Sequence, residues 1–136
     1  MNKTYTSLVL TALVALTTGC GTSFALAADP SVPFAAGEVS ASFVENGNNA
    51  FEVEVHHLGD PSKLNPKATT YVVWATPKKD GATIQNVGAL KVDSDYSGKL
   101  EFTTAFSQFV LTITPEPSAE VSVPTGRDVL KGNIAR

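Results

Sequence analysis

Apolar and polar residues alternate with a period of two through most of this chain, and this pattern most constrains its fold. The alternation is clearest in AFEVEVHHL at 50–58, where phenylalanine and valine would share one face of a strand and the glutamates the other. Turn residues such as NGNN at 46–49 interrupt the pattern about every ten positions, and no long stretch has the 3.6-residue period of a helix. The sequence therefore predicts an all-β domain.

The turn residues divide the chain into separate expected strands. In chain order these are 38–45, 50–58, 69–76, 83–93, 99–106 and 108–116, with 127–135 closing the domain. The first two are expected to form a hairpin, 69–76 is apolar on both faces as in a central strand, and Gly88 is expected at a bulge. About seven strands in about 100 residues predict a Greek-key sandwich that resembles immunoglobulin or fibronectin domains.

The N-terminal segment has the features of an export signal. Lys3 supplies a positive charge, residues 7–19 are uncharged and mostly apolar, and small residues follow. This stretch is shorter than the roughly 20 residues that a membrane-spanning helix needs, and no second one follows, so no transmembrane helix is predicted. We therefore expect the protein outside the inner membrane of a bacterium, either anchored to a membrane or free in the periplasm or the medium.

Two possible cleavage sites decide the fate of Cys20, the only cysteine in the chain. A lipoprotein signal would be cut before Cys20, whose acylated thiol would then anchor the protein to a membrane. Ordinary signal cleavage would instead follow ALA at 25–27 and discard the cysteine. The sequence favours acylation and leaves both alternatives open. The expected division is a signal at 1–27 (or 1–19 in a lipoprotein), a flexible leader at 28–37 and the β-sandwich domain at 38–136.

Charge and cysteine content limit the possible partners. The formal net charge of −3 becomes −4 when Lys3 is removed with the signal, and the charged residues are interspersed without a basic stripe. This argues against a nucleic-acid partner and against electrostatic adhesion to anionic lipid. No disulfide can form within a chain that has one cysteine, so the domain must rely on its hydrophobic core. No cofactor is expected.

The adjacent His56 and His57 are the first candidates for a metal site. Neighbouring residues on a strand point to opposite faces, so the two rings would share an ion only at a bulge or a strand end. By parity His57 belongs to the inward face, and we interpret it as a semi-buried residue that hydrogen-bonds the loop after Leu58. No metal site is predicted, and His56 and His57 remain weak candidates. The alternative function is a periplasmic small-ligand or metal-binding protein that uses this region and Asp60.

No arrangement of residues typical of catalysis is present. The chain lacks the G-x-S-x-G nucleophile elbow and the glycine-rich loops that hold phosphates. Glu52 and Glu54 share a strand face, but alternating charges are ordinary on the solvent side of a sheet. Trp74 is interpreted as a core residue. The sequence therefore predicts that the protein is not an enzyme.

Several short motifs in the second half are similar to a known family. They are TTYVVWAT, NVGALKVD and FVLTITPEPSAEVSVPTGRDVLKG, which resemble the extracytoplasmic C-terminal domain of anti-sigma-K factors. The matching positions are Tyr71, Trp74, Gly88, Leu90, Thr114, Glu116, Pro117, Pro124, Thr125, Gly126, Val129 and Leu130. The resemblance implies that these residues define a β-fold and that the domain senses or contacts a protein without catalysis. The chain lacks the sigma-binding domain and transmembrane helix of that family, and its first half fits small exported bacterial proteins of unknown function.

Together these features predict an exported, non-enzymatic β-sandwich module of the bacterial cell envelope. We expect a lipoprotein that is anchored through Cys20 and contacts an envelope protein or another surface component.

Overall fold

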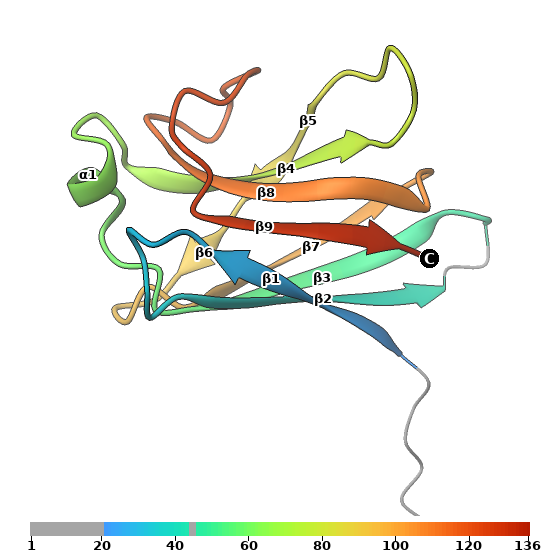
Figure 1. Ribbon diagram of the computed structural model, residues 1–136, viewed down its shortest axis with the longest axis horizontal. Helices are drawn as coiled ribbons and strands as arrows, with labels where there is room; N and C mark the ends of the chain where they lie inside the picture. The colour runs from blue at the N-terminus through green and yellow to red at the C-terminus, as the bar shows by residue number, and fades with distance from the viewer. Residues whose placement is uncertain (1–20, 44–45) are drawn as a thin grey trace, which may run out of the picture.

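The computed structural model describes residues 21–43 and 46–136, which form an all-β domain (Figure 1). Its strands are β1 (Thr22–Ala28), β2 (Ala36–Phe43), β3 (Asn49–His56), β4 (Thr70–Pro77), β5 (Gln85–Ala89), β6 (Lys91–Val92), β7 (Gly98–Thr104), β8 (Gln108–Glu116) and β9 (Leu130–Ala135). The single helical turn described, α1, covers Pro61–Leu64. No helix in the described part is long and apolar enough to cross a membrane.

The strands form one antiparallel sheet that is nearly closed. Its order is β5-β4-β8-β9-β1-β2-β3-β7-β6. The two end strands, β5 and β6, are consecutive in the chain and only Leu90 separates them. The sheet therefore curls until its two ends almost meet. The predicted all-β class is confirmed, with nine strands in the described residues in place of about seven.

Most of the expected strands lie where the alternation placed them. β2 and β3 form the expected hairpin, in which Ala41 pairs with Phe51. β4 is buried along most of its length and pairs with β5 on one side and β8 on the other, as expected of a central strand. The expected strand 83–93 is instead divided at Leu90 into β5 and β6. The pairing of β4 with β5 shifts register opposite Gly88, as expected of a bulge.

The N-terminal part of the domain differs from the expected flexible leader. Strand β1 lies between β2 and β9, and β2 already begins at Ala36. The intervening residues 29–35 form hydrogen-bonded turns, in which Val32 N–H donates to the Asp29 carbonyl at 2.9 Å. Residues 1–20, including Cys20, lie outside the described residues. The first strand thus begins sixteen residues before the expected boundary at 38.

The curled sheet encloses the main hydrophobic core. Its largest contributors are the inward side chains of β3, β4, β8 and β9. The rings of Phe51 and Phe102 stack with centroids 5.5 Å apart, and the ring of Phe109 meets that of Phe51 edge-on at 5.1 Å. This aromatic cluster joins β3, β7 and β8 across the interior.

A second buried layer lies on the outward side of β4 and β8. Val72 and Trp74 on β4 and Thr114 on β8 have no solvent exposure, yet they point away from the main core. Residues 117–129, here called the strap, run along this side of the sheet (Figure 1). The strap holds no regular strand or helix, and its cover explains why β4 is apolar on both faces.

Candidate functional site

One end of the domain carries a groove between two loops. Residues 29–35, residues 57–60 and helix α1 meet there, at the end opposite to where β1 begins (Figure 1). The groove has a volume of about 250 Å³ and is lined by Ser31, Val32, Pro33, Phe34, His57, Leu58, Gly59, Asp60, Lys63 and Leu64. Phe34 is 84 % exposed, in contrast to the aromatic residues of the core. We call this feature the Phe34 groove.

The first wall of the Phe34 groove is fixed by Asp29. Its carboxylate accepts hydrogen bonds from the backbone N–H of Ser31 at 2.9 Å and from the Ser31 hydroxyl at 2.6 Å. These bonds hold the pKa of the Asp29 carboxyl below its ordinary value. Arg127 of the strap adds an ion pair at 3.5 Å. The loop that presents Phe34 is therefore held in one shape by its own side chains.

The second wall repeats the same chemistry at the start of α1. The Asp60 carboxylate accepts from the backbone N–H of Ser62 at 2.9 Å and from the Ser62 hydroxyl at 2.7 Å, which lowers the pKa of Asp60. The buried Tyr71 hydroxyl donates to the carbonyl of Gly59 at 2.8 Å. Burial of this phenol raises its pKa. Hydrogen bonds within the chain thus hold both walls of the groove in place.

These walls share a sequence signal that the alternation pattern does not reveal. The tripeptide Asp-Pro-Ser occurs at 29–31 and again at 60–62, and the two copies form the two turns. The sequence analysis names Asp60 as a candidate residue. It does not name Phe34, because Phe34 lies in the segment that is expected to be a flexible leader. The two copies of this turn-forming tripeptide mark the two walls in the sequence. They do not show that the walls lie side by side in the folded domain.

His57 lies on the surface, which corrects its interpretation as semi-buried. Strand β3 ends at His56, and His57 has φ 56°, in the left-handed region. This backbone turn breaks the alternation, so His57 faces solvent and Leu58 occupies the inward place with 1 % exposure. The ring centroids of His56 and His57 lie 6.4 Å apart with a 48° tilt. The two histidines are therefore neighbours at a strand end.

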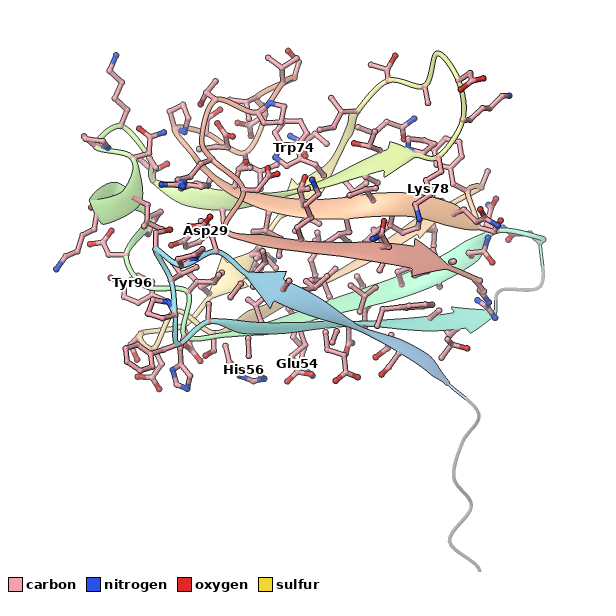
Figure 2. All side chains as sticks on the ribbon, in the orientation of Figure 1. Asp29, Glu54, His56, Trp74, Lys78 and Tyr96 are labelled. Carbon is pink, nitrogen blue, oxygen red and sulfur yellow. The ribbon has the colours of Figure 1, made fainter. Side chains whose placement is uncertain are left out.

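The outward face of β3 and β7 carries a set of exposed ion pairs. Lys99 Nζ lies 3.7 Å from a Glu52 oxygen and 3.6 Å from a Glu54 oxygen. His56 Nε2 lies 3.3 Å from a Glu54 oxygen, and Figure 2 shows these two side chains next to each other. An open hollow of about 620 Å³ lies beside them. Exposed pairs of this kind contribute little to stability. Within the described residues, no three His, Cys, Asp or Glu side chains gather in a way that could hold a metal ion.

Glu116 is a fully buried carboxylate at the end of β8. It accepts hydrogen bonds from the Thr114 hydroxyl at 2.6 Å, from the Gly126 N–H at 3.1 Å, and from both the N–H and the hydroxyl of Thr125. The Trp74 indole N–H donates to the Thr114 hydroxyl at 2.8 Å, which extends the network under the strap. Burial alone would raise the pKa of Glu116, but the hydrogen bonds outweigh it and lower the pKa.

The other positions named by the resemblance lie around the same part of the sheet. Gly126 packs so closely on the Pro115 carbonyl that a Cβ there would lie 2.2 Å from the oxygen. The Pro117 carbonyl accepts from the Thr69 hydroxyl at 2.9 Å, and the buried Leu90 donates its N–H to the Tyr71 carbonyl at 2.9 Å. Pro124 lies in the strap beside Thr125. Most of these residues lie on or beside β4 and β8 or in the strap. Tyr71 and Val129 also reach the walls of the Phe34 groove, through hydrogen bonds to Gly59 and Asp29.

Comparison with protein-family models finds no family that matches this chain. Comparison with curated proteins finds no relative either. The geometry of the described residues is therefore the basis for any functional proposal.

Proposed function

We propose that this chain is an exported, non-enzymatic β-domain of the bacterial cell envelope, anchored through an acylated Cys20, which contacts another envelope protein through the Phe34 groove. The single observation that carries the contact role is this groove. A large aromatic side chain, 84 % exposed, stands beside an apolar hollow with polar residues at its rim. Exposed apolar surface that is rimmed by polar residues is typical of protein interaction sites. The occupant fits the chemistry of an extended peptide segment that places one apolar side chain in the hollow.

The rigidity of the groove supports this role. Both walls are fixed by side-chain bonds to the backbone, from Asp29 to Ser31 and from Asp60 to Ser62. Binding to a preformed surface loses less conformational entropy than binding to a mobile loop, so even a small contact area can be effective.

The position of the groove also fits an anchored protein. Gly21 alone separates Cys20 from the start of β1. Strand β1 then runs for seven residues toward the groove, which corresponds to about 20 Å at 3.3 Å per residue. An anchor at Cys20 would hold the start of β1 near the membrane and leave the Phe34 groove at the far end of the domain, since the loops that form the groove lie opposite the start of β1 (Figure 1).

The proposal includes a Greek-key sandwich of the immunoglobulin or fibronectin type. The strand order supports it, because four strands stand on each side of β1: β2, β3, β7 and β6 on one side, and β9, β8, β4 and β5 on the other. Such sandwiches commonly serve as binding modules. The anti-sigma-K-like motifs, which imply sensing or protein contact without catalysis, agree with this use.

The contact role can be tested by photo-crosslinking in the native host. A crosslinking amino acid at position 34 should give a defined adduct with an envelope protein, and the matched control at Val123, the other large exposed apolar residue described, should not. Phe34→Ala should remove the partner from pull-downs and leave the free energy of unfolding within about 0.5 kcal/mol of wild type, because the side chain is exposed. The same adducts from both positions, or none from position 34, would refute the contact role.

The anchor has its own test. Membrane fractionation and intact mass spectrometry of the mature protein should show a membrane-bound form with added acyl mass, and Cys20→Ala should release or mislocalise it. A mature protein that keeps β1 but carries no acyl mass would refute the anchor and leave the contact role standing.

A second candidate, a metal-binding protein, is favoured by the left-handed turn at His57. The ring centroids lie 6.4 Å apart, and imidazole nitrogens bind zinc at about 2.0–2.1 Å, so the two rings would have to move closer together to share one tetrahedral ion. Imidazole ligands suit Cu²⁺ and Zn²⁺. Calorimetry should then show binding that is lost in both His56→Ala and His57→Ala, with a metal-dependent rise in melting temperature. The absence of a binding signal would reject this candidate.

A further inference from the structure

Leu26 on β1 fits between two glycines of the neighbouring strands. It is 8 % exposed, and its side chain lies against Gly37 on β2 and Gly132 on β9. A Cβ atom built on Gly37 would lie 2.9 Å from Leu26 Cδ1, and one built on Gly132 would lie 2.5 Å from Leu26 Cδ2. Real Cβ contacts are essentially never that short, so a larger residue at either position would force the Leu26 side chain to shift.

Neither glycine is required by its backbone conformation. The described glycines with positive φ are Gly47, Gly59, Gly81 and Gly88, and this set does not include Gly37 or Gly132. These two glycines therefore matter because they leave space for the Leu26 side chain. Glycine inside a strand destabilises the folded state, because it loses more conformational entropy on folding than other residues. Two glycines that both face Leu26 thus indicate that Leu26 is part of the folded domain.

The backbone of β1 is bound on both sides. Residues 22–26 pair with β2, and Ala27 and Ala28 pair with Lys131 and Leu130 of β9. The pairing continues in Asp29, whose N–H donates to the Val129 carbonyl at 2.9 Å. In the sheet order β1 is the strand that separates β2 from β9. Removing it would leave unpaired backbone groups along both neighbours and open the core.

We infer that β1 belongs to the mature domain and that N-terminal processing ends before Thr22. Cleavage after Ala27 would discard residues 22–27 of the strand, including Leu26. Of the two bonds that the sequence offers for cleavage, the one before Cys20 leaves β1 whole. This inference rests on the proposed export, because it states where an exported chain is processed.

The test uses the full chain, exported from a bacterial host, and intact mass spectrometry of the product. The mature mass should include residues 22–28. Ala27→Val, which makes the last residue before the alternative bond too large for cleavage, should leave the mature N-terminus unchanged and raise the mass only by the two carbons and four hydrogens that valine adds. Ala27 is exposed, so the variant is compatible with the fold. A product that begins at Ala28, and that disappears in Ala27→Val, would overturn the inference.

A second measurement does not depend on export. Leu26→Ala in the same chain should lower the melting temperature by about 10 °C or more, since loss of a buried leucine strongly destabilises a domain of this size. Ala25→Ser, at an exposed position of the same strand, is the matched control and should change it little. An unchanged melting temperature in Leu26→Ala would overturn the inference. A chain that stays in the cytoplasm would refute the proposed export, while the comparison of these two variants still decides whether β1 is part of the domain.

Discussion

Replacing Glu116 by glutamine tests whether the buried carboxylate holds the strap on the sheet. Glutamine keeps the shape of the side chain and removes its charge. Four donors from three residues, Thr114, Thr125 and Gly126, converge on the two carboxylate oxygens. Hydrogen bonds to a charged group contribute about 1.5–3 kcal/mol each and neutral ones about 0.5–1.5, and the contributions do not add fully. We therefore expect Glu116→Gln to lower the free energy of unfolding by about 2–3 kcal/mol at pH 7.

The effect should depend on pH in a defined direction. The pKa of Glu116 is lowered in the folded state from an ordinary value of 4.5. Its stabilising effect is therefore complete above about pH 4.5, and it is lost as the pH falls through the folded-state pKa, because the unfolded chain takes up the proton first. Glutamine does not titrate, so the difference between wild type and Glu116→Gln should narrow as the pH is lowered below 4.5.

Urea unfolding followed by fluorescence is a suitable assay, because Trp74 is the only tryptophan and its indole bonds to Thr114 in this network. The matched control is Glu101→Gln, the same substitution at an exposed position of β7, which should change the free energy by less than about 0.5 kcal/mol. The reasoning is refuted if both variants lose the same stability, or if the difference between Glu116→Gln and wild type stays constant from pH 7 to pH 3.

Four further substitutions test other contacts by the same unfolding assay. Leu26→Ala should lower the free energy of unfolding by about 2–5 kcal/mol and Gly132→Ala by about 1–3 kcal/mol. The double variant should lose at least about 1 kcal/mol less than the sum of the two, because the alanine methyl at position 132 fills space that the leucine vacates. Strict additivity of the two losses would contradict this packing. Gly88→Ala should lower stability by about 1–3 kcal/mol, because φ is 137° and a Cβ would lie 3.1 Å from Leu100 Cδ1, and a neutral result would contradict this. His57→Gly should raise stability by about 0.5–1 kcal/mol by removing the strain of the left-handed backbone, and a loss would show that the histidine ring makes a stabilising contact.

The sequence predicted those strands whose two faces differ in polarity. In β3 every second residue is buried, so the period of two is visible without the structure. β4 was recognised for the opposite reason, since both of its faces are apolar and one lies under the strap. Gly88 was placed at a bulge because glycine is unusual inside a strand. Each of these predictions depended on local information alone.

Strand β1 could not be predicted because its pattern is hidden by alanine. The inward residues of TSFALAA are Phe24 and Leu26, but the outward ones include Ala25 and Ala27, which count as apolar in any sequence pattern. The same alanines belong to ALA at 25–27, the alternative signal-cleavage site. The Leu26 side chain packs into the space left by Gly132, which lies more than a hundred residues later in the sequence. Only the folded structure brings these two residues together.

The Phe34 groove shows the same limit for function. Each wall depends on a local signal, an aspartate that accepts hydrogen bonds from the serine two residues later, and both signals are present in the sequence. That they form one groove depends on β1 leading residues 29–35 to the end of the sheet where β3 finishes and α1 begins. If processing removed β1, the first wall would lose the strand that positions it, and Phe34 would be an exposed residue on a loose end. The contact role proposed for the groove therefore requires that β1 remains in the mature protein.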